Sequence, residues 1–192
     1  MKKILQKNEK VLRQIAEEVR VHDIKTTKIK KILKEMSEAL QSQDDGVAIA
    51  APQIGYSLRI FVVAGKIFTA GFPGQGVSQA DEPRSSAGSA EPDSDPAKED
   101  HALNDLIFIN PKISKLSREK EWMPEGCLSV RPLFGKTFRS TKAIITAYDE
   151  DGKKFTRGAS GILAQIFQHE TDHLNGILFI DHAKDIKAEL PK

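Results

Sequence analysis

Residues 161–176 read GILAQIFQHETDHLNG, and this stretch decides which fold and which chemistry we expect. Apolar residues recur in its first half at helical spacing, and its Asn-Gly end is a typical helix terminus. His169 and His173 lie four residues apart, so both imidazoles face one side of the helix and could bind one metal ion. The apolar half buries part of this helix face, where an unpaired histidine pair would be costly. The stretch therefore predicts a core helix that carries two metal ligands.

The composition fits one domain, residues 1–192, with a single active site. A hydrophobic content of 39% and a formal net charge of +2 indicate neither a membrane span nor general disorder. Charged and polar residues interrupt the first ten residues, MKKILQKNEK, before the apolar core of a signal peptide could form. We therefore expect a cytoplasmic protein that binds neither DNA nor a membrane.

Hydrophobic patterns along the chain predict N-terminal helices followed by strands. Apolar residues at helical spacing predict helices over residues 11–19 and 26–43. Runs rich in Ile, Val and Phe predict strands over residues 58–65, 106–113 and 142–149, the last of them leading through an Asp-Gly turn into a hairpin. This order predicts an α+β fold in which mostly antiparallel sheets pack around the central metal-binding helix.

Residues 70–105 differ in composition from the rest of the chain. They contain eight acidic and two basic residues among Pro, Gly, Ser and Ala, and few large apolar ones. A segment of this kind cannot bury a core of its own, and a connection of this length is unusual inside a compact domain. We interpret residues 70–105 as an acidic, low-complexity, disordered insertion between two strands.

A metal ion that does chemistry usually has three protein ligands and one open position for water. His169 and His173 supply two ligands, and Glu170 directly follows the first of them. At that place a carboxylate could accept a proton from an activated water without binding the ion itself. The identity of the third ligand then decides between classes of enzyme.

The zinc-endopeptidase pattern H-E-x-x-H-x-x-G-x-x-H predicts the third ligand downstream, but the chain has Phe179 at the last position. Cys127, in WMPEGCLSV, is the strongest remaining candidate, because a thiolate completes a Cys-His-His set suited to iron, zinc, cobalt or nickel. Other residues with ligand chemistry lie in less suitable places: Asp181 and His182 downstream, His22 in a linker-like segment and His101 in the acidic insertion.

Three stretches together resemble the motifs of one family. GVAIAAPQIG (46–55), EGCLS (125–129) and QHETDHLNG (168–176) occur in the order and character of the three motifs of the peptide deformylases. The N-terminal segment ILQKNEKVLRQIAEEV is also similar to that family, and Arg139 stands where the family has an arginine after its cysteine motif. The resemblance covers nearly the whole chain apart from the acidic insertion.

The resemblance implies a role for each matching residue. Cys127, His169 and His173 would bind one divalent metal ion, Fe2+ in the cell, with Zn2+, Ni2+ or Co2+ able to replace it. Glu170 would take a proton from the attacking water and deliver it to the leaving amine. The side chain of Gln53 and the backbone N–H of Leu128 would stabilise the oxyanion.

The resemblance also implies the substrate and its surroundings. The enzyme would remove the formyl group from the N-terminal formyl-methionine of newly made proteins and release formate. Gly46, Val47, Ala48 and Gly126 would contact this peptide, which would pair with the enzyme as an extra strand. A monomer is expected, with the ribosome near its exit tunnel as a further partner.

The chain departs from the family pattern at a few positions. Ala48 replaces a glycine, so its methyl group would strain the backbone if φ is positive there, or narrow the pocket. Gln165 is polar on a helix face expected to be apolar, unless it hydrogen-bonds locally, and Arg131 stands where proline is common. Two alternatives remain: a catalytically impaired deformylase-like protein that binds metal and peptide, and a zinc endopeptidase, which Phe179 disfavours.

Overall fold

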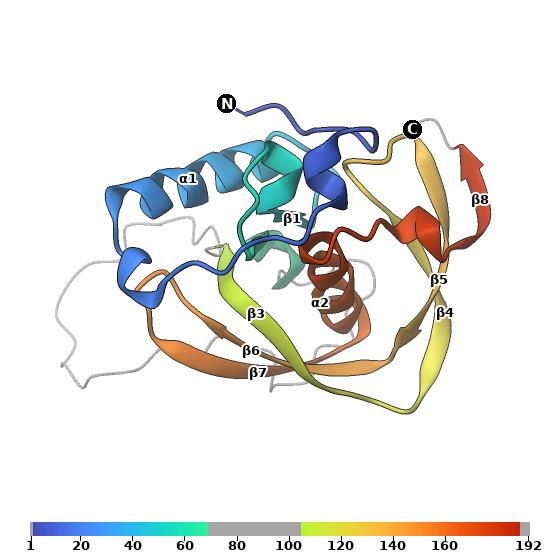
Figure 1. Ribbon diagram of the computed structural model, residues 1–192. Helices are drawn as coiled ribbons and strands as arrows, with labels where there is room; N and C mark the ends of the chain where they lie inside the picture. Colours follow the sequence, from blue (N-terminus) through green and yellow to red (C-terminus); the bar gives the residue numbers. More distant parts are fainter. Residues whose placement is uncertain (1, 69–104, 189–192) are drawn as a thin grey trace, which may run out of the picture.

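The computed structural model describes residues 2–68 and 105–188, which form two antiparallel sheets with a helix between them (Figure 1). The helices are α1 (Thr27–Gln41) and α2 (Gly161–Leu174). The strands are β1 (Ala48–Ala50), β2 (Ile60–Val63), β3 (Leu106–Leu116), β4 (Lys120–Gly126), β5 (Leu133–Ser140), β6 (Lys142–Tyr148), β7 (Lys154–Ser160) and β8 (Lys184–Ala188). Within residues 2–68 and 105–188, five short 3-10 helices span Lys10–Arg13, Val21–Asp23, Ala51–Ile54, Gly65–Phe68 and Phe179–Asp181.

The larger sheet has the strand order β1-β2-β3-β6-β7, and the smaller sheet has the order β4-β5-β8. All of the strand pairs in both sheets are antiparallel. The helix α2 lies between the two sheets, directly below β1 in Figure 1. This arrangement confirms the predicted α+β fold with antiparallel sheets around a central helix.

The helix α2 is central because most of its side chains are buried. Phe167 packs against Phe108 with ring centroids 5.2 Å apart, and Phe108 stacks on Phe61 at 4.5 Å. All three rings are buried, and they join the helix to the inner strands β2 and β3. Each aromatic side chain removes a large apolar area from water, so this cluster fixes the position of α2 on the larger sheet.

The helix α1 confirms the prediction for residues 26–43. It begins after Thr26, whose side chain accepts a hydrogen bond from the N–H of Ile29 as an N-cap. Its apolar stripe is buried against the other face of the larger sheet, together with Ile49, Ile60 and Val62. The two helices therefore cover opposite faces of β1 and β2.

The helix predicted over residues 11–19 is wrong beyond a single 3-10 turn at Lys10–Arg13. Downstream of that turn the backbone bonds to other segments: Ala16 N–H donates to the carbonyl of Leu174, and Glu17 pairs with the segment around Leu58. The buried side chain of Asn110 bonds both the N–H and the carbonyl of Val19, at 2.8 and 2.7 Å. These tertiary partners replace helical hydrogen bonds and override the helical pattern.

The predicted strands are confirmed as β2, β3 and β6, and the Asp-Gly hairpin is confirmed as β6–β7. The sequence patterns missed β1, β4, β5 and β8. Of these, β4 contains Pro124, which is tolerated because β4 lies at an edge of its sheet. The acidic insertion predicted over residues 70–105 falls outside the described residues except for its last one. In the described part of the chain, no helix is long and apolar enough to cross a membrane.

The C-terminal end of α2 depends on Gly176, which has a φ of +74°. A Cβ at this position would lie 2.8 Å from the backbone carbonyl group of Arg13, because the N-terminal segment passes directly over it. We therefore expect Gly176→Ala to combine backbone strain with a clash and to lower the free energy of unfolding by about 2–4 kcal/mol, measured by urea unfolding.

Gly158→Ala is the matched control, because a Cβ there would meet nothing within 4 Å and its φ is not positive. This variant should unfold within about 0.5 kcal/mol of the wild type. Equal stability of the two variants would contradict the packing of the N-terminal segment on Gly176.

Candidate metal centre and peptide pocket

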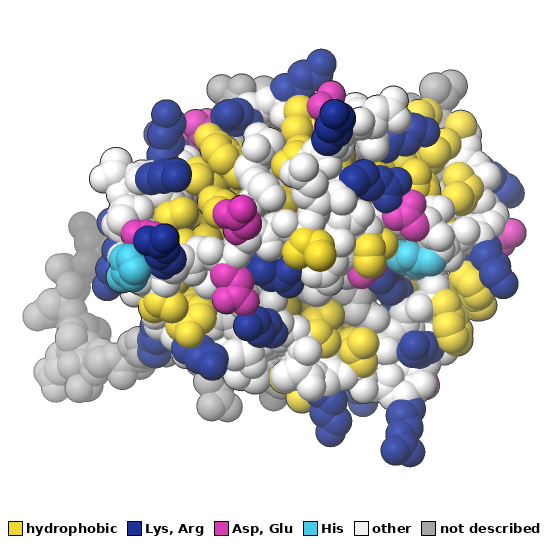
Figure 2. Space-filling model, in the orientation of Figure 1, with side chains coloured by type: hydrophobic (Ala, Val, Ile, Leu, Met, Phe, Trp, Pro, Cys, Tyr) yellow, Lys and Arg dark blue, Asp and Glu magenta, His cyan; other side chains and the backbone are white. Residues whose placement is uncertain are grey.

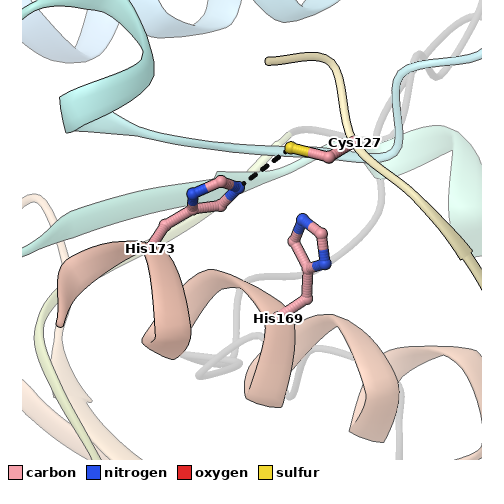
Figure 3. Close-up of side chains that lie close together, drawn as sticks. All are labelled: Cys127, His169 and His173. Atoms are coloured by element: carbon pink, nitrogen blue, oxygen red, sulfur yellow. Dashed lines mark hydrogen bonds between the residues drawn. The ribbon is translucent and has the colours of Figure 1, made fainter. Parts of the chain in front are cut away.

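Cys127, His169 and His173 form the one group of possible metal ligands found among the described residues. Their sulfur and nitrogen atoms lie within 4.8 Å of one another, and the Sγ of Cys127 is 3.1 Å from the Nε2 of His173. Figure 3 shows the two rings rising from successive turns of α2 toward the thiol. The structure thus brings together the three residues that the sequence analysis selected.

The backbone explains how these residues meet. The histidines are four positions apart on α2, so their rings project from the same side of the helix, with centroids 4.8 Å apart. Cys127 directly follows β4 and faces this side of the helix. Its sulfur accepts a hydrogen bond from the N–H of Ser129 at 3.4 Å, which holds the turn after the strand.

A buried carboxylate, Glu125, orients one of the two rings. The Nδ1 of His169 lies 2.8 Å from its Oε1, and Arg139 donates to both of its oxygens, at 2.7 and 3.0 Å. Thr137 and Gln165 donate to Oε2 at 2.6 and 3.2 Å. Because the carboxylate is an acceptor, Nδ1 carries the proton, and Nε2 is left to face the thiol.

Charge complementarity keeps Glu125 ionised although it is buried. Burial alone would raise its pKa, but hydrogen bonds from His169 and Arg139 and their positive charges hold the pKa of Glu125 well below its ordinary value. Arg139 also pairs with Asp172 at 2.6 Å, so this arginine bridges two carboxylates. The ion pairs replace the water that burial has removed from these groups.

Glu125 is a functional residue that was not predicted from the sequence, although it lies in the same motif as Cys127. The available signal was strand alternation: in an extended strand, residues 125 and 127 point to the same side of the sheet. A carboxylate two positions before a ligand cysteine is therefore well placed to contact a ligand on the neighbouring helix. Asp172, to which the sequence pattern gave little weight, pairs with Arg139 and lies 3.9 Å from His182.

The two histidines have opposite pKa shifts. Burial lowers the pKa of His173 well below its ordinary value, and the nearby charge of His169 adds to this effect. Burial also opposes the charge on His169, but hydrogen bonds to Cys127 and Glu125 outweigh it and raise the pKa of His169 well above its ordinary value. His173 is therefore a neutral imidazole at pH 7, the form that binds metal ions.

Glu170 lies beside the cluster with only 3% of its surface exposed. Its Oε2 has no hydrogen-bond partner in the described part of the chain. Burial raises the pKa of Glu170 to about 7, against the lowering effect of the charge on His169. A carboxyl group with a pKa near 7 can both accept and release a proton at neutral pH.

Gln53 is held in place by bonds to its neighbours. Its Oε1 accepts from the N–H of Ala50 at 2.8 Å, and its Nε2 donates to the Oγ of Ser129 at 3.0 Å. The same Nε2 lies 3.6 Å from the sulfur of Cys127. The amide therefore presents its donor end to the cluster.

A pocket of about 190 Å³ opens beside the cluster and exposes mostly apolar atoms. This is smaller than the roughly 300–1,000 Å³ of pockets for drug-sized ligands, and it suits a single side chain with a short length of backbone. Its lining includes Cys127, Leu128, Gln53, His169 and Glu170. All four residues expected to contact the substrate also line it: Gly46, Val47, Ala48 and Gly126.

The departures from the motif have simple explanations in the structure. Ala48 is buried in β1 opposite Val63, and in the described part of the chain only Asn110 and Asp185 combine a side chain with positive φ. The backbone at Ala48 is therefore not strained. Gln165 donates to the carbonyl of Pro124 at 2.8 Å as well as to Glu125, so its amide is satisfied locally.

The other potential ligands considered from the sequence lie away from the cluster. His182 and Asp181 are exposed, and Asp181 pairs with Arg13. His22 is exposed beside Asp23, and His101 falls outside the described residues. Phe179 is buried in a hydrophobic cluster with Leu12, Val130 and Leu178. The geometry thus gives no support to the zinc-endopeptidase alternative.

In this antiparallel α+β fold, the central helix carries two histidines and a buried glutamate beside a small pocket, and a cysteine lies next to them. These features together define a class of small hydrolases. Within that class, the chain belongs to the polypeptide deformylase family, whose sequence profile matches residues 1–189. This family membership makes the protein an enzyme that acts on peptides.

Similar proteins from two bacteria support the same assignment. The chain is 35% identical to a peptide deformylase of Borreliella burgdorferi over 86% of its own length and 79% of that protein. It is 33% identical to peptide deformylase 2 of Clostridium acetobutylicum over 94% of each chain.

Solved structures agree with the fold. A class I type b peptide deformylase from Acinetobacter baumannii with bound Met-Ala-Ser superposes with a TM-score of 0.73 and 27% identity, covering 95% of this chain and 98% of that one. A peptide deformylase from Synechococcus elongatus in complex with actinonin gives 0.71 and 26%, covering 96% and 79%.

The ion pair between Glu125 and Arg139 is buried, so the stability of the fold should depend on it. Arg139→Met should leave a buried carboxylate without its main partner and lower the free energy of unfolding by about 3–5 kcal/mol, measured by urea unfolding followed by circular dichroism. Arg13→Met removes an ion pair with Asp181 at the surface and should cost less than about 1 kcal/mol. A similar small loss in both variants would show that the Glu125 network does not hold the sheet to the helix.

Proposed function

We propose that the protein hydrolyses the formyl amide at the N-terminal formyl-methionine of newly made proteins, releasing formate and a free amine. The observation that carries this proposal is Glu170, a buried carboxyl with a raised pKa beside a Cys-His-His cluster. Hydrolysis of an amide needs a group that takes a proton from water and gives one to the amine, and Glu170 is placed to do both.

The donor set fits one divalent metal ion held by Cys127, His169 and His173. Their sulfur and nitrogen atoms all lie within 4.8 Å of one another, so one ion could contact all three, and thiolate and imidazole are both common ligands of divalent transition metals. When bound, the ion would act as a Lewis acid that makes water a better nucleophile at neutral pH. We propose Fe2+ as the ion in the cell, with Zn2+, Ni2+ or Co2+ able to replace it. The supply of each metal ion in the cell, rather than the order of their affinities for the site, decides which one is bound.

The other residues would act on the proton and on the developing charge. Glu170 would accept a proton from the attacking water and later deliver it to the amine nitrogen as the C–N bond breaks. The amide of Gln53 and the backbone N–H of Leu128 would donate to the oxygen that becomes negative on the formyl carbon. Glu125 would keep the His169 ring in one tautomer through the Nδ1 bond.

The pocket fits the proposed peptide end. Val47, Ile162 and Ile166 provide apolar atoms for a methionine side chain. β4 is an edge strand, so its backbone could pair with an extended peptide near Gly126. The bound Met-Ala-Ser of the Acinetobacter baumannii enzyme is a peptide of this type. Gly46 and Ala48 would then line the opposite side.

We propose one catalytic domain over residues 1–192 that acts as a monomer in the cytoplasm, since the family profile matches nearly its whole length. Its substrates emerge from the ribosome, so proximity to the exit tunnel would give the enzyme early access to them. Ala48, with unstrained backbone, is compatible with turnover.

Glu170→Ala should retain the metal ion but lower the rate of formate release from formyl-Met-Ala peptides by about 10²–10⁴-fold, because proton transfer is lost. Formate release and metal content should be measured in one anaerobic preparation, since a thiolate and ferrous iron are both oxidisable. Glu150→Gln, at an exposed turn, serves as a control with unchanged activity. A wild-type protein that holds metal and binds the peptide without releasing formate would instead be a catalytically impaired binding protein.

Cys127→Ala should lower the metal content well below one ion per chain, because two histidines alone leave the site without its thiolate. The control is His182→Ala, which removes a possible ligand outside the cluster and should leave the metal content unchanged. Metal analysis of the purified proteins gives the result directly. Full metal content and activity in Cys127→Ala would overturn the assignment of the third ligand.

A further inference from the structure

The smaller sheet has one face that packs toward α2 and one that faces solvent. Side chains along β4 and β5 alternate between the two, so Met123, Glu125, Thr137 and Arg139 are buried. The intervening positions are exposed. Pro124 and Phe134, at the same alternation, line the pocket. We call the other exposed side chains on this side, together with the lysine at the start of β8, the outer face: Lys120, Trp122, Lys136, Phe138 and Lys184.

Two aromatic rings lie side by side on the outer face. Trp122 and Phe138 are direct partners in the β4–β5 register, with ring centroids 5.2 Å apart. They are 44% and 51% exposed, although burying such rings is normally favourable. An exposed aromatic pair on rigid strands is a feature that requires an explanation, and nothing in the metal site uses it.

Lysines surround this ring pair. The Nζ of Lys184 lies 4.8 Å from the centroid of the Trp122 ring, and the Nζ of Lys120 lies 6.0 Å from that of Phe138. Lys136 lies on β5 between them, and its Nζ is 3.6 Å from the carboxylate of Asp185. Among these three lysines, Lys136 is therefore the one with a carboxylate partner within 4 Å in the described part of the chain. Figure 2 shows hydrophobic and basic side chains next to one another on the side where Figure 1 draws β4, β5 and β8.

We propose that the outer face binds single-stranded RNA. Aromatic rings exposed on a sheet stack with unpaired bases, and lysines around them contact the phosphates; this combination binds single strands with little sequence preference. An acidic protein segment could form ion pairs with the lysines, but it would have no bases to stack on the two aromatic rings, so RNA fits the surface better. Lys184 and Lys120 are exposed and can leave the rings to contact phosphate.

The choice of RNA over DNA rests on the proposed function, because newly made proteins are found beside RNA rather than DNA. The outer face is separate from the metal centre, whose residues lie on the opposite side of β4 and β5. RNA binding and formate release can therefore be measured independently, and failure of one leaves the other intact.

The chain offers a built-in probe, since Trp122 is its only tryptophan. A 12-nucleotide oligo-uridine RNA should quench the intrinsic fluorescence of the full-length, metal-loaded enzyme in a saturable titration at 0.1 M salt. Affinity should fall with rising salt, because phosphate contacts release counterions. Absence of quenching, or equal affinity for duplex RNA, would overturn the proposal.

Variants identify the residues, with fluorescein-labelled RNA anisotropy as the readout. Lys120→Glu/Lys184→Glu should weaken binding at least tenfold. Lys28→Glu/Lys30→Glu on α1 changes the net charge equally at a distant, exposed place and should weaken binding less than threefold. Equal losses would mean that net charge alone attracts RNA, and the proposed surface would be wrong.

The stacking itself is tested at Phe138. Phe138→Leu keeps an apolar side chain without a ring and should weaken RNA binding several-fold, whereas Phe138→Tyr should bind as the wild type does. Both should release formate at the wild-type rate. If Leu and Tyr bind RNA equally, stacking is excluded. If vesicles containing phosphatidylserine shift the Trp122 emission to the blue while RNA has no effect, the outer face binds membranes instead and the RNA proposal fails.

Discussion

The carboxylate of Glu125 joins the elements that the rest of the structure depends on. It sits on β4 and accepts hydrogen bonds from Thr137 and Arg139 on β5 and from Gln165 and His169 on α2. A buried carboxylate is costly to desolvate, so the arrangement is stable only if these donors stay in place. The smaller sheet and the central helix are therefore locked together at the point where the metal ligands meet.

This constraint links stability to chemistry. Apolar packing of Phe167 on Phe108 positions α2 on the larger sheet. Apolar contacts alone, however, define the rotation of a helix about its own axis only loosely. The directional bonds to Glu125 select one rotation, in which both histidines face Cys127. They also keep the proton of His169 on Nδ1, so that its Nε2 points toward the thiol. Glu170 directly follows His169 on α2, and its side chain then lines the pocket.

The sequence predicted the central helix and the fold class from strong local patterns. It predicted the meeting of Cys127 with His169 and His173 from ligand chemistry and from the family resemblance. The prediction from sequence was wrong where tertiary contacts determine the backbone conformation. Leu12, Ala16 and Val19 are buried at intervals that look helical, yet the backbone between them bonds to Leu174 and Asn110. A pattern of burial records which side chains face the core, and it does not reveal which partner satisfies the backbone.

The same reasoning explains why two departures from the family motif do not strain the structure. Ala48 has a methyl group where glycine was expected, but it pairs with Val63 in a regular strand and its φ is not positive, so the methyl group causes no backbone strain. Gln165 looked like a polar defect in an apolar pocket. Its amide instead completes the set of donors to Glu125 and reaches the carbonyl of Pro124 on the same strand. A polar residue on this helix face therefore strengthens the contact between α2 and β4, which an apolar side chain at position 165 could not do.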